Sequence, residues 1–114
     1  MARPKTKHRD DPGEEIIRGR LDYAAQIGMA NGITPPEVAA LRPLLAVLPV
    51  AIARERVAEV LGLELSPKTL ANMDSLQTGP RLRFLVGHRA MYPTAYLLEW
   101  MERRGLEVVA RRDA

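Results

Sequence analysis

The chain has no cysteine, few aromatic residues and no long apolar run. Without cysteine among its 114 residues, it holds neither disulfides nor thiolate metal sites. Its longest apolar stretch, residues 44–53, is too short to span a bilayer and contains Pro49. Residues 1–15 lack the apolar core that a secretory signal requires. We therefore expect a cytoplasmic protein that does not enter a membrane.

Groups for catalysis and metal binding are equally sparse. His8 and His88 are separated by most of the chain, and neither has a carboxylate at metal-ligand spacing. Gly79-Pro80 is a helix stop and not a phosphate-binding loop after a strand. The acidic pairs Asp10-Asp11 and Glu14-Glu15 lie in a polar segment, where solvated charge is expected. We expect no enzyme, no cofactor and no metal site.

Positive charge gathers in two parts of a chain whose net charge is only +3. Residues 1–9 include four basic side chains before the first acid. Residues 66–92 carry four more against a single acid, Asp74, with His88 in addition. These four are Lys68, Arg81, Arg83 and Arg89. Such clusters favour an anionic partner such as nucleic acid, and solubility alone is the alternative explanation.

The N-terminal part of the chain predicts an arm followed by a helix. Residues 1–13, rich in Pro, Lys, Arg and Asp, predict a disordered basic arm. A helix is expected over residues 14–30, because apolar and small residues recur there at spacings of three and four. Asn31-Gly32 provides a suitable end for it.

A second helix is expected from Thr34, which would serve as its N-cap. Pro35 would occupy the first helical position, and Glu37 would close a capping box. Pro43 should kink or split this helix. Together, residues 14–49 are predicted to form an N-terminal helical extension.

Two short helices are expected next. The first lies within "VAIARERVAEVLG", residues 50–62, and ends at Gly62. The second begins with Ser66 as N-cap and Pro67 at its first position, and it stops near Gln77. Two short helices joined by a compact turn follow the helix-turn-helix plan.

Beyond Pro80 the apolar period changes to two, which predicts a β-hairpin. One face would turn to the core, with Leu82, Phe84 and Val86. The other face would carry Arg81, Arg83 and Leu85. Gly87-His88 suits a two-residue type II′ turn, which would place Phe84 opposite Met91.

A last helix is expected over about residues 94–104, ending at Gly105. Its inward side chains would be Leu97, Trp100 and Met101. Tyr92 and Tyr96 are expected to place their rings in the core and their hydroxyls in water. Residues 106–114 form a short basic tail.

Several motifs follow one another in an order that is typical of one class of DNA-binding domain. They are "VAEVLG" in the first short helix, "SPKTL" opening the second, "TGP" at its end, a hairpin ending in Tyr92, and then Leu97 and Trp100. This order resembles the winged helix-turn-helix of excisionases, AlpA-type prophage regulators and the DNA-binding heads of MerR proteins. The resemblance covers about residues 50–105. It implies a mainly α fold with a small β-hairpin, here preceded by N-terminal helices.

The chain departs from that pattern in three ways. The turn between the short helices, residues 62–67, is about two residues longer than the usual form, and Met73 stands where the family often has Trp. The dimerisation coil and effector domain that follow the head in longer MerR-type proteins have no counterpart here. Small-molecule sensing by that route is therefore not expected.

The N-terminal end of the second short helix is the predicted base-reading element. Its polar side is formed by Ser66, Lys68, Thr69 and Asn72. Lys68 can donate to guanine and Asn72 can pair with adenine, whereas Ser66 and Thr69 suit phosphate contacts. The alternatives are that Ser66 serves only as the N-cap and that Asn72 is merely solvated.

The hairpin is the predicted wing. Its candidate DNA contacts are Arg81, Arg83, His88 and Arg89. Arginines on a narrow ribbon can lie along phosphates or enter the minor groove. The alternative is a solvated strand edge that its charges protect from pairing.

From these observations we predict a sequence-specific protein for double-stranded DNA. It would be a transcriptional regulator or an excisionase-like architectural factor of a prophage or mobile element. One winged head makes few base contacts, so we expect a homodimer or several copies on the DNA, assembled through residues 16–48. The alternative is an adaptor whose N-terminal helices bind another protein, or a small terminase-like subunit that recognises DNA for packaging.

Overall fold

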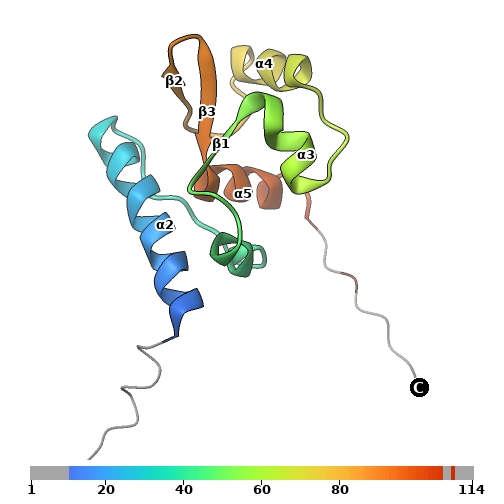
Figure 1. Ribbon diagram of the computed structural model, residues 1–114. Helices are drawn as coiled ribbons and strands as arrows, with labels where there is room; N and C mark the ends of the chain where they lie inside the picture. Colours follow the sequence, from blue (N-terminus) through green and yellow to red (C-terminus); the bar gives the residue numbers. More distant parts are fainter. Residues whose placement is uncertain (1–10, 107–108, 110–114) are drawn as a thin grey trace, which may run out of the picture.

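The computed structural model describes residues 11–106 and residue 109, and over these residues the chain forms four α-helices and one antiparallel sheet (Figure 1). The α-helices are α2 (Pro12–Ala30), α3 (Val57–Leu61), α4 (Pro67–Ser75) and α5 (Thr94–Arg103). The strands are β1 (Ala51–Ala53), β2 (Phe84–Val86) and β3 (Arg89–Pro93), in the order β1-β3-β2. Two short 3₁₀ turns occupy Arg42–Ala46 and Arg54–Arg56. The prediction of a mainly helical chain with a hairpin is confirmed, and a third strand joins the hairpin.

α2 begins and ends where its capping residues lie. The carboxylate of Asp11 accepts a hydrogen bond from the Gly13 amide at 3.0 Å, so the helix begins two residues earlier than predicted. Asn31 closes it, donating its side-chain amide to the Ile27 carbonyl at 2.8 Å. Apart from residues 11–13, the predicted arm lies outside the described residues.

The helix expected from Thr34 does not form. The amides of Glu37, Ala39 and Leu41 donate to carboxylates on α5, at 2.8–3.0 Å, instead of to carbonyls four residues earlier. These acceptors belong to Glu99 and Glu102, about sixty residues away, so the local sequence pattern could not predict these hydrogen bonds. Only the 3₁₀ turn at Arg42–Ala46 remains of the predicted helix.

The sheet combines a predicted hairpin with an unexpected strand. Phe84 pairs with Met91 and Val86 with Arg89 around Gly87, whose φ is +65°, so the predicted register and turn position are confirmed. β1 pairs with the other side of β3, with Ile52 opposite Tyr92. This strand lies just before the predicted helix and was not predicted, because its pairing partner in β3 is about 40 residues away.

Two buried apolar clusters meet at α5. The first joins α2 to α5 and has at its centre Ile17, Ala24, Leu45, Leu82, Ala95, Tyr96 and Leu98. The second lies under α3, α4 and the sheet and contains Ile52, Val57, Leu70, Tyr92, Leu97 and Trp100. In Figure 1, α2 accordingly lies on one side of α5, and α3 and α4 lie on the other. The apolar residues of segment 16–48 that predicted an assembly surface are largely used in the first cluster.

The tyrosine hydroxyls are turned into the protein, contrary to the prediction. Tyr96 donates to the Thr34 carbonyl at 2.8 Å, and Tyr92 donates to Asp74 at 2.6 Å. Burial raises the pKa of both phenols. Trp100 and Leu97 are buried as predicted.

Candidate nucleic-acid interface

The turn between α3 and α4 is long, and it is ordered by local caps. Gly62 closes α3 in the left-handed conformation (φ +69°), and the Leu63 amide donates to the Ala58 carbonyl at 2.9 Å. Leu65 then packs partly against the second apolar cluster. Ser66 ends the turn, its hydroxyl accepting from the Thr69 amide at 3.1 Å. The extra residues thus extend the loop while α4 still begins at its predicted position.

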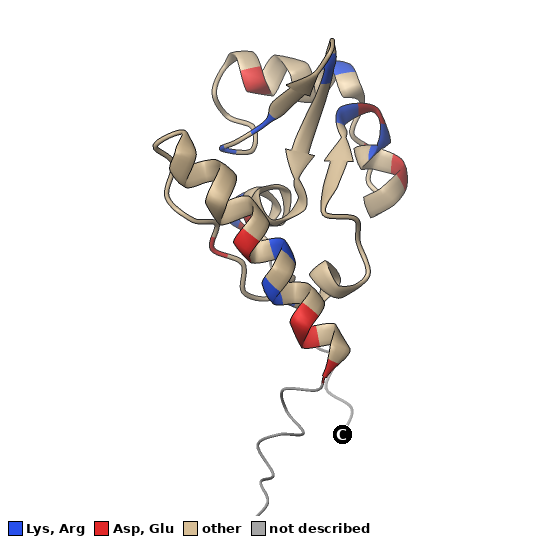
Figure 2. Cartoon of the chain, turned by 60° about the vertical axis from the view of Figure 1, so that its left-hand side comes forward, with Lys and Arg blue, Asp and Glu red and all other residues tan. Residues whose placement is uncertain are grey.

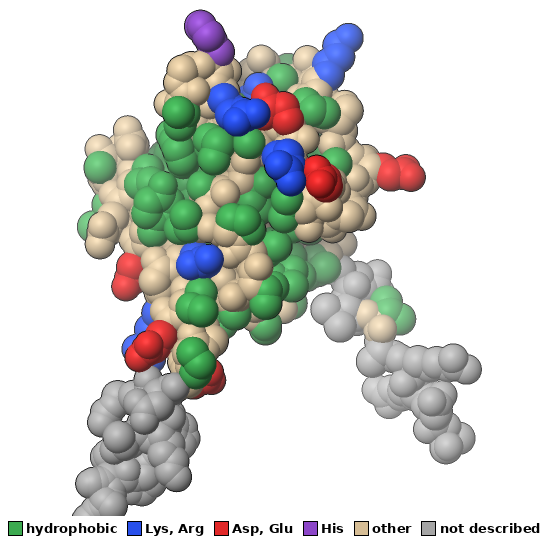
Figure 3. Space-filling view, in the orientation of Figure 1, with side chains coloured by type: hydrophobic (Ala, Val, Ile, Leu, Met, Phe, Trp, Pro, Cys, Tyr) green, Lys and Arg blue, Asp and Glu red, His purple; other side chains and the backbone are tan. Residues whose placement is uncertain are grey.

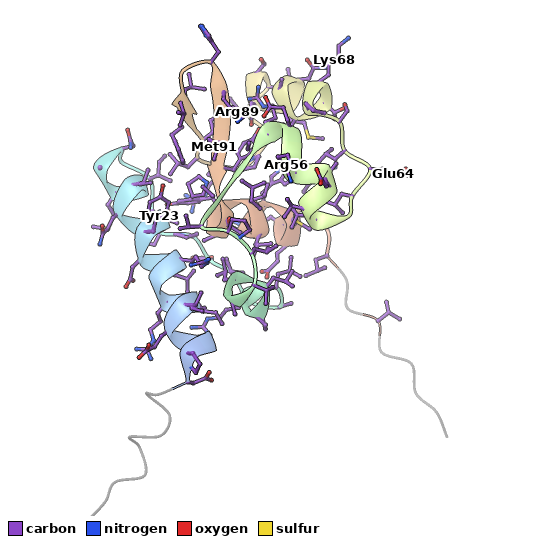
Figure 4. All side chains as sticks on the ribbon, in the orientation of Figure 1. Tyr23, Arg56, Glu64, Lys68, Arg89 and Met91 are labelled. Carbon is purple, nitrogen blue, oxygen red and sulfur yellow. The ribbon has the colours of Figure 1, made fainter. Side chains whose placement is uncertain are left out.

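α4 is anchored on one side and open on the other. Leu70 is fully buried, and Met73 packs beside it against the second cluster. The predicted contact residues Ser66, Lys68, Thr69 and Asn72 are all exposed. Figure 4 shows Lys68 pointing away from the body of the molecule. Ser66 and Thr69 also hydrogen-bond each other through their hydroxyls at 2.9 Å, so both help to cap the helix.

The hairpin beside α4 supplies two further exposed cations, Arg83 and Arg89, and an exposed histidine. His88 lies in the exposed turn, and the side chains of Arg83 and Arg89 are 45% and 60% exposed. Arg89 lies 3.5 Å from the half-exposed carboxylate of Glu55. Ion pairs as exposed as this one contribute little to stability, so its arginine can exchange partners readily.

Arg81 does not join these residues. Its guanidinium forms two hydrogen bonds with the buried carboxylate of Glu99, at 2.9 and 3.0 Å, and another with the Thr34 hydroxyl at 2.9 Å. It also lies over the Tyr96 ring, 5.3 Å from the centroid. The hydrogen bond with Glu99 raises the pKa of Arg81 above its usual value. The structure therefore uses Arg81 to attach the start of the hairpin to α5 and to the segment after α2.

A buried polar network that the sequence did not predict connects α4 to the sheet. Oδ2 of Asp74, at the end of α4, accepts from the Tyr92 hydroxyl at 2.6 Å and from Arg54 Nη2 at 2.7 Å. Arg54 Nε also donates to the Tyr92 hydroxyl at 3.1 Å, and Arg83 lies 3.9 Å from Oδ2. Burial, assisted by the bond to Asp74, raises the pKa of Tyr92 to about 12. The network fixes the orientation of α4 relative to β3.

The link from α4 to the hairpin passes close to the same carboxylate. A Cβ atom at Gly79 would overlap Oδ1 of Asp74, which explains the glycine at this position. Oδ1 has no hydrogen-bond partner among the described residues. The only sequence signal for this network was that Asp74 is the single acid in a basic stretch.

The charged side chains around α4 and the hairpin are mostly basic, with acidic side chains among them. Figure 2 shows basic residues on the hairpin and on the helices beside it. Figure 3 shows basic side chains on the upper part of one face, two of them next to acidic ones. Such pairs are Arg89 with Glu55 and Arg56 with Glu59, the latter at 2.9 Å. Lys68 and His88 have no ion pair among the described residues.

Two other features were sought in the described part of the chain, a metal site and a membrane-spanning helix. No group of three or more His, Asp or Glu side chains there is placed to hold a metal ion. None of the helices described is long and apolar enough to cross a membrane.

Comparison with known proteins finds no matching family model, no matching curated protein and no matching solved structure.

Proposed function

We propose that the protein binds double-stranded DNA in a sequence-specific manner, through a winged helix-turn-helix formed by α3, α4 and the β2–β3 hairpin. The observation that carries this proposal is the exposed, capped, polar side of α4, a helix whose other end is joined at Asp74 to Tyr92 of the hairpin and lies near Arg83. α4 is held from behind by Leu70 and by the Asp74–Tyr92 hydrogen bond, so its outer side is free for a ligand. The order of motifs in residues 50–105 supports the same assignment.

α4 suits the major groove of B-DNA, which is wide enough to admit an α-helix. Lys68 and Asn72 stand on its exposed side, one helical turn apart, where they reach base edges. Lysine donates to guanine, and asparagine forms paired hydrogen bonds with adenine. Ser66 and Thr69 lie at the helix N-terminus, where hydroxyls and amides meet a phosphate.

The hairpin would contact the DNA beside the groove that α4 occupies. Arg83 and Arg89 are its exposed cations and His88 is exposed in its turn, whereas Arg81 is bound to Glu99. Three of the four wing residues predicted from the sequence thus remain candidates for DNA contact, and Arg81 does not. Their contacts with phosphates would position the protein without reading sequence.

One such head buries little DNA surface, so we propose that several copies occupy repeated or palindromic sites. This arrangement fits a transcriptional regulator or an excisionase-like architectural factor of a prophage or mobile element. Assembly on DNA is favoured over a preformed dimer through segment 16–48, because most of that segment's apolar side chains pack inside the chain.

The test is selection of duplexes from a random pool with the full chain, followed by fluorescence anisotropy on a recovered duplex. Affinity should fall steeply between about 50 and 200 mM salt. Lys68→Ala should weaken binding about tenfold, and Asn72→Ala should relax the preference at one base pair. Arg89→Ala should reduce the salt slope by about one.

Arg18→Ala provides the matched control. Arg18 is 60% exposed and belongs to α2, whose N-terminal half lies at the opposite end of the molecule from α4 (Figure 1). Its removal deletes the same charge as Lys68→Ala but should leave affinity within about twofold. Failure to recover any motif, together with salt-independent binding, would refute the proposal and favour a protein-binding adaptor.

A further inference from the structure

The β2–β3 hairpin extends beyond the apolar clusters and exposes two aliphatic side chains. Leu85 and Val86, adjacent on β2, are 65% and 60% exposed. Gly87 and His88 follow them in the turn, which is exposed as well. Neither aliphatic side chain belongs to the two buried clusters. A position beyond the core explains why they are exposed, and it also makes them available to a ligand of the hairpin.

The strand register places these two side chains on opposite faces of the ribbon. Leu85 pairs with Ala90, and successive residues alternate, so Leu85 shares a face with Tyr92 and Ile52. That face looks toward α4, because the Tyr92 hydroxyl reaches Asp74. Val86 pairs with Arg89 on the other face.

Leu85 lies on the face that the sequence predicted to carry Arg81 and Arg83, but Arg81 is turned to Glu99, and Val86, predicted to face the core, is exposed as well. Arg83 lies on the same face, two residues before Leu85, but its guanidinium is drawn inward to 3.9 Å from Asp74. Ala90, opposite Leu85, is small and buried, so its side chain would not keep a ligand from reaching Leu85. Among the strand residues on this side of the hairpin, Leu85 is therefore the exposed one, whereas Ala90 and Tyr92 are buried.

We propose that Leu85 enters the minor groove of the bound DNA as an apolar wedge and bends the duplex. This inference rests on the proposed DNA-binding function. With α4 in the major groove, this wedge requires the α4-facing side of the hairpin to reach the flanking minor groove. A leucine inserted between base pairs partly unstacks them and kinks the duplex toward the major groove.

The surrounding charges fit a duplex better than an apolar protein partner. Arg89 lies at the hairpin tip and Arg83 just before β2, so an apolar partner would have to bury cations together with Leu85. Phosphates on both sides of a minor groove would pair with them instead. Pyrimidine–purine steps such as TA are the expected insertion sites, because they unstack most easily.

The test measures DNA bending separately from DNA binding. The full chain is titrated onto a selected duplex that carries fluorophores at both ends, and energy transfer reports the bend. A second duplex carries 2-aminopurine at the expected step, and its fluorescence rises when the base unstacks. Wild-type protein should bend the duplex by tens of degrees and increase the 2-aminopurine signal.

Leu85→Ala and Val86→Ala are the matched variants. Both remove an exposed aliphatic side chain from the same strand, on opposite faces. Leu85→Ala should lose at least about half of the bend and all of the 2-aminopurine signal, with affinity reduced about tenfold. Val86→Ala should behave as wild type. Circular dichroism and thermal unfolding check that each variant is folded, and exposed sites of this kind tolerate alanine.

The outcomes separate this inference from the function on which it rests. If the wild-type protein binds no duplex, the proposed function fails and the wedge fails with it. If it binds with a normal salt dependence but leaves the duplex straight, only the wedge is refuted. Equal loss of bending in Leu85→Ala and Val86→Ala would also overturn it, because the assignment of Leu85 depends on the difference between the two faces.

Discussion

Replacing Tyr92 by phenylalanine should change how the protein's stability depends on pH. The Tyr92 side chain is fully buried, and its hydroxyl donates to Asp74 at 2.6 Å and accepts from Arg54 at 3.1 Å. These surroundings disfavour the phenolate and raise the pKa from 10.0 to about 12. Because the folded-state pKa is above the unfolded one, the neutral phenol stabilises the fold fully below pH 10. That contribution is lost as pH rises from about 10 to about 12.

The size of the effect follows from the shift. Two pKa units, at about 1.4 kcal/mol each, correspond to about 3 kcal/mol of stability lost across this interval. Tyr92→Phe has no ionisable group there, so this step should be missing from its stability curve. At pH 8 the variant should be less stable by about 1.5–3 kcal/mol, because it lacks a hydrogen bond to a buried carboxylate. The two curves should therefore approach each other above pH 10.

Urea unfolding at pH 8, 10 and 11.5, followed by circular dichroism, measures this difference. Tyr23→Phe is the control, since it removes one tyrosine that has no hydroxyl hydrogen bond among the described residues. Its stability curve should run parallel to that of the wild type. If the difference between Tyr92→Phe and the wild type is the same at pH 8 and pH 11.5, the account of the buried network is wrong.

Three further substitutions, and Gly19→Ala as a control for one of them, test the packing, the α4 cap and the Arg81–Glu99 ion pair by urea unfolding. Gly28→Ala should destabilise the fold by about 1–3 kcal/mol, because its Cβ would overlap the Tyr96 hydroxyl. Gly19→Ala, on the same helix but with open space around it, should stabilise the fold by about 0.5–1 kcal/mol. Equal effects of the two would contradict the close contact between Gly28 and Tyr96. Ser66→Ala should cost about 1 kcal/mol by removing the α4 cap, and a change below about 0.3 kcal/mol would argue against it. Glu99→Gln should cost about 2 kcal/mol or more, because the Arg81 guanidinium loses its buried partner; an unchanged urea midpoint would show that this ion pair is dispensable.

Much of the candidate interface could be predicted from the sequence because it depends on short-range signals. Ser66-Pro67 sets the start of α4, and Gly87 sets the hairpin turn, each through bonds or torsions within a few residues. The exposure of Lys68 and Asn72 follows from the same helical period that buries Leu70. The role of Arg81 could not be predicted, because its charge is the same whether it faces solvent or a buried carboxylate.

The sequence by itself determined the Ser66 cap of α4, the helix stops at Asn31 and Gly62, and the hairpin register of this protein. The tertiary structure decided the rest. β1 became a strand because it pairs with β3. Residues 34–41 form no helix because their amides donate to the carboxylates of Glu99 and Glu102. It also turned the Tyr92 hydroxyl to Asp74. The physical reason is distance along the chain. A cap is completed within a few residues, whereas these partners lie about 20 to 60 residues away and meet only when both apolar clusters close around α5.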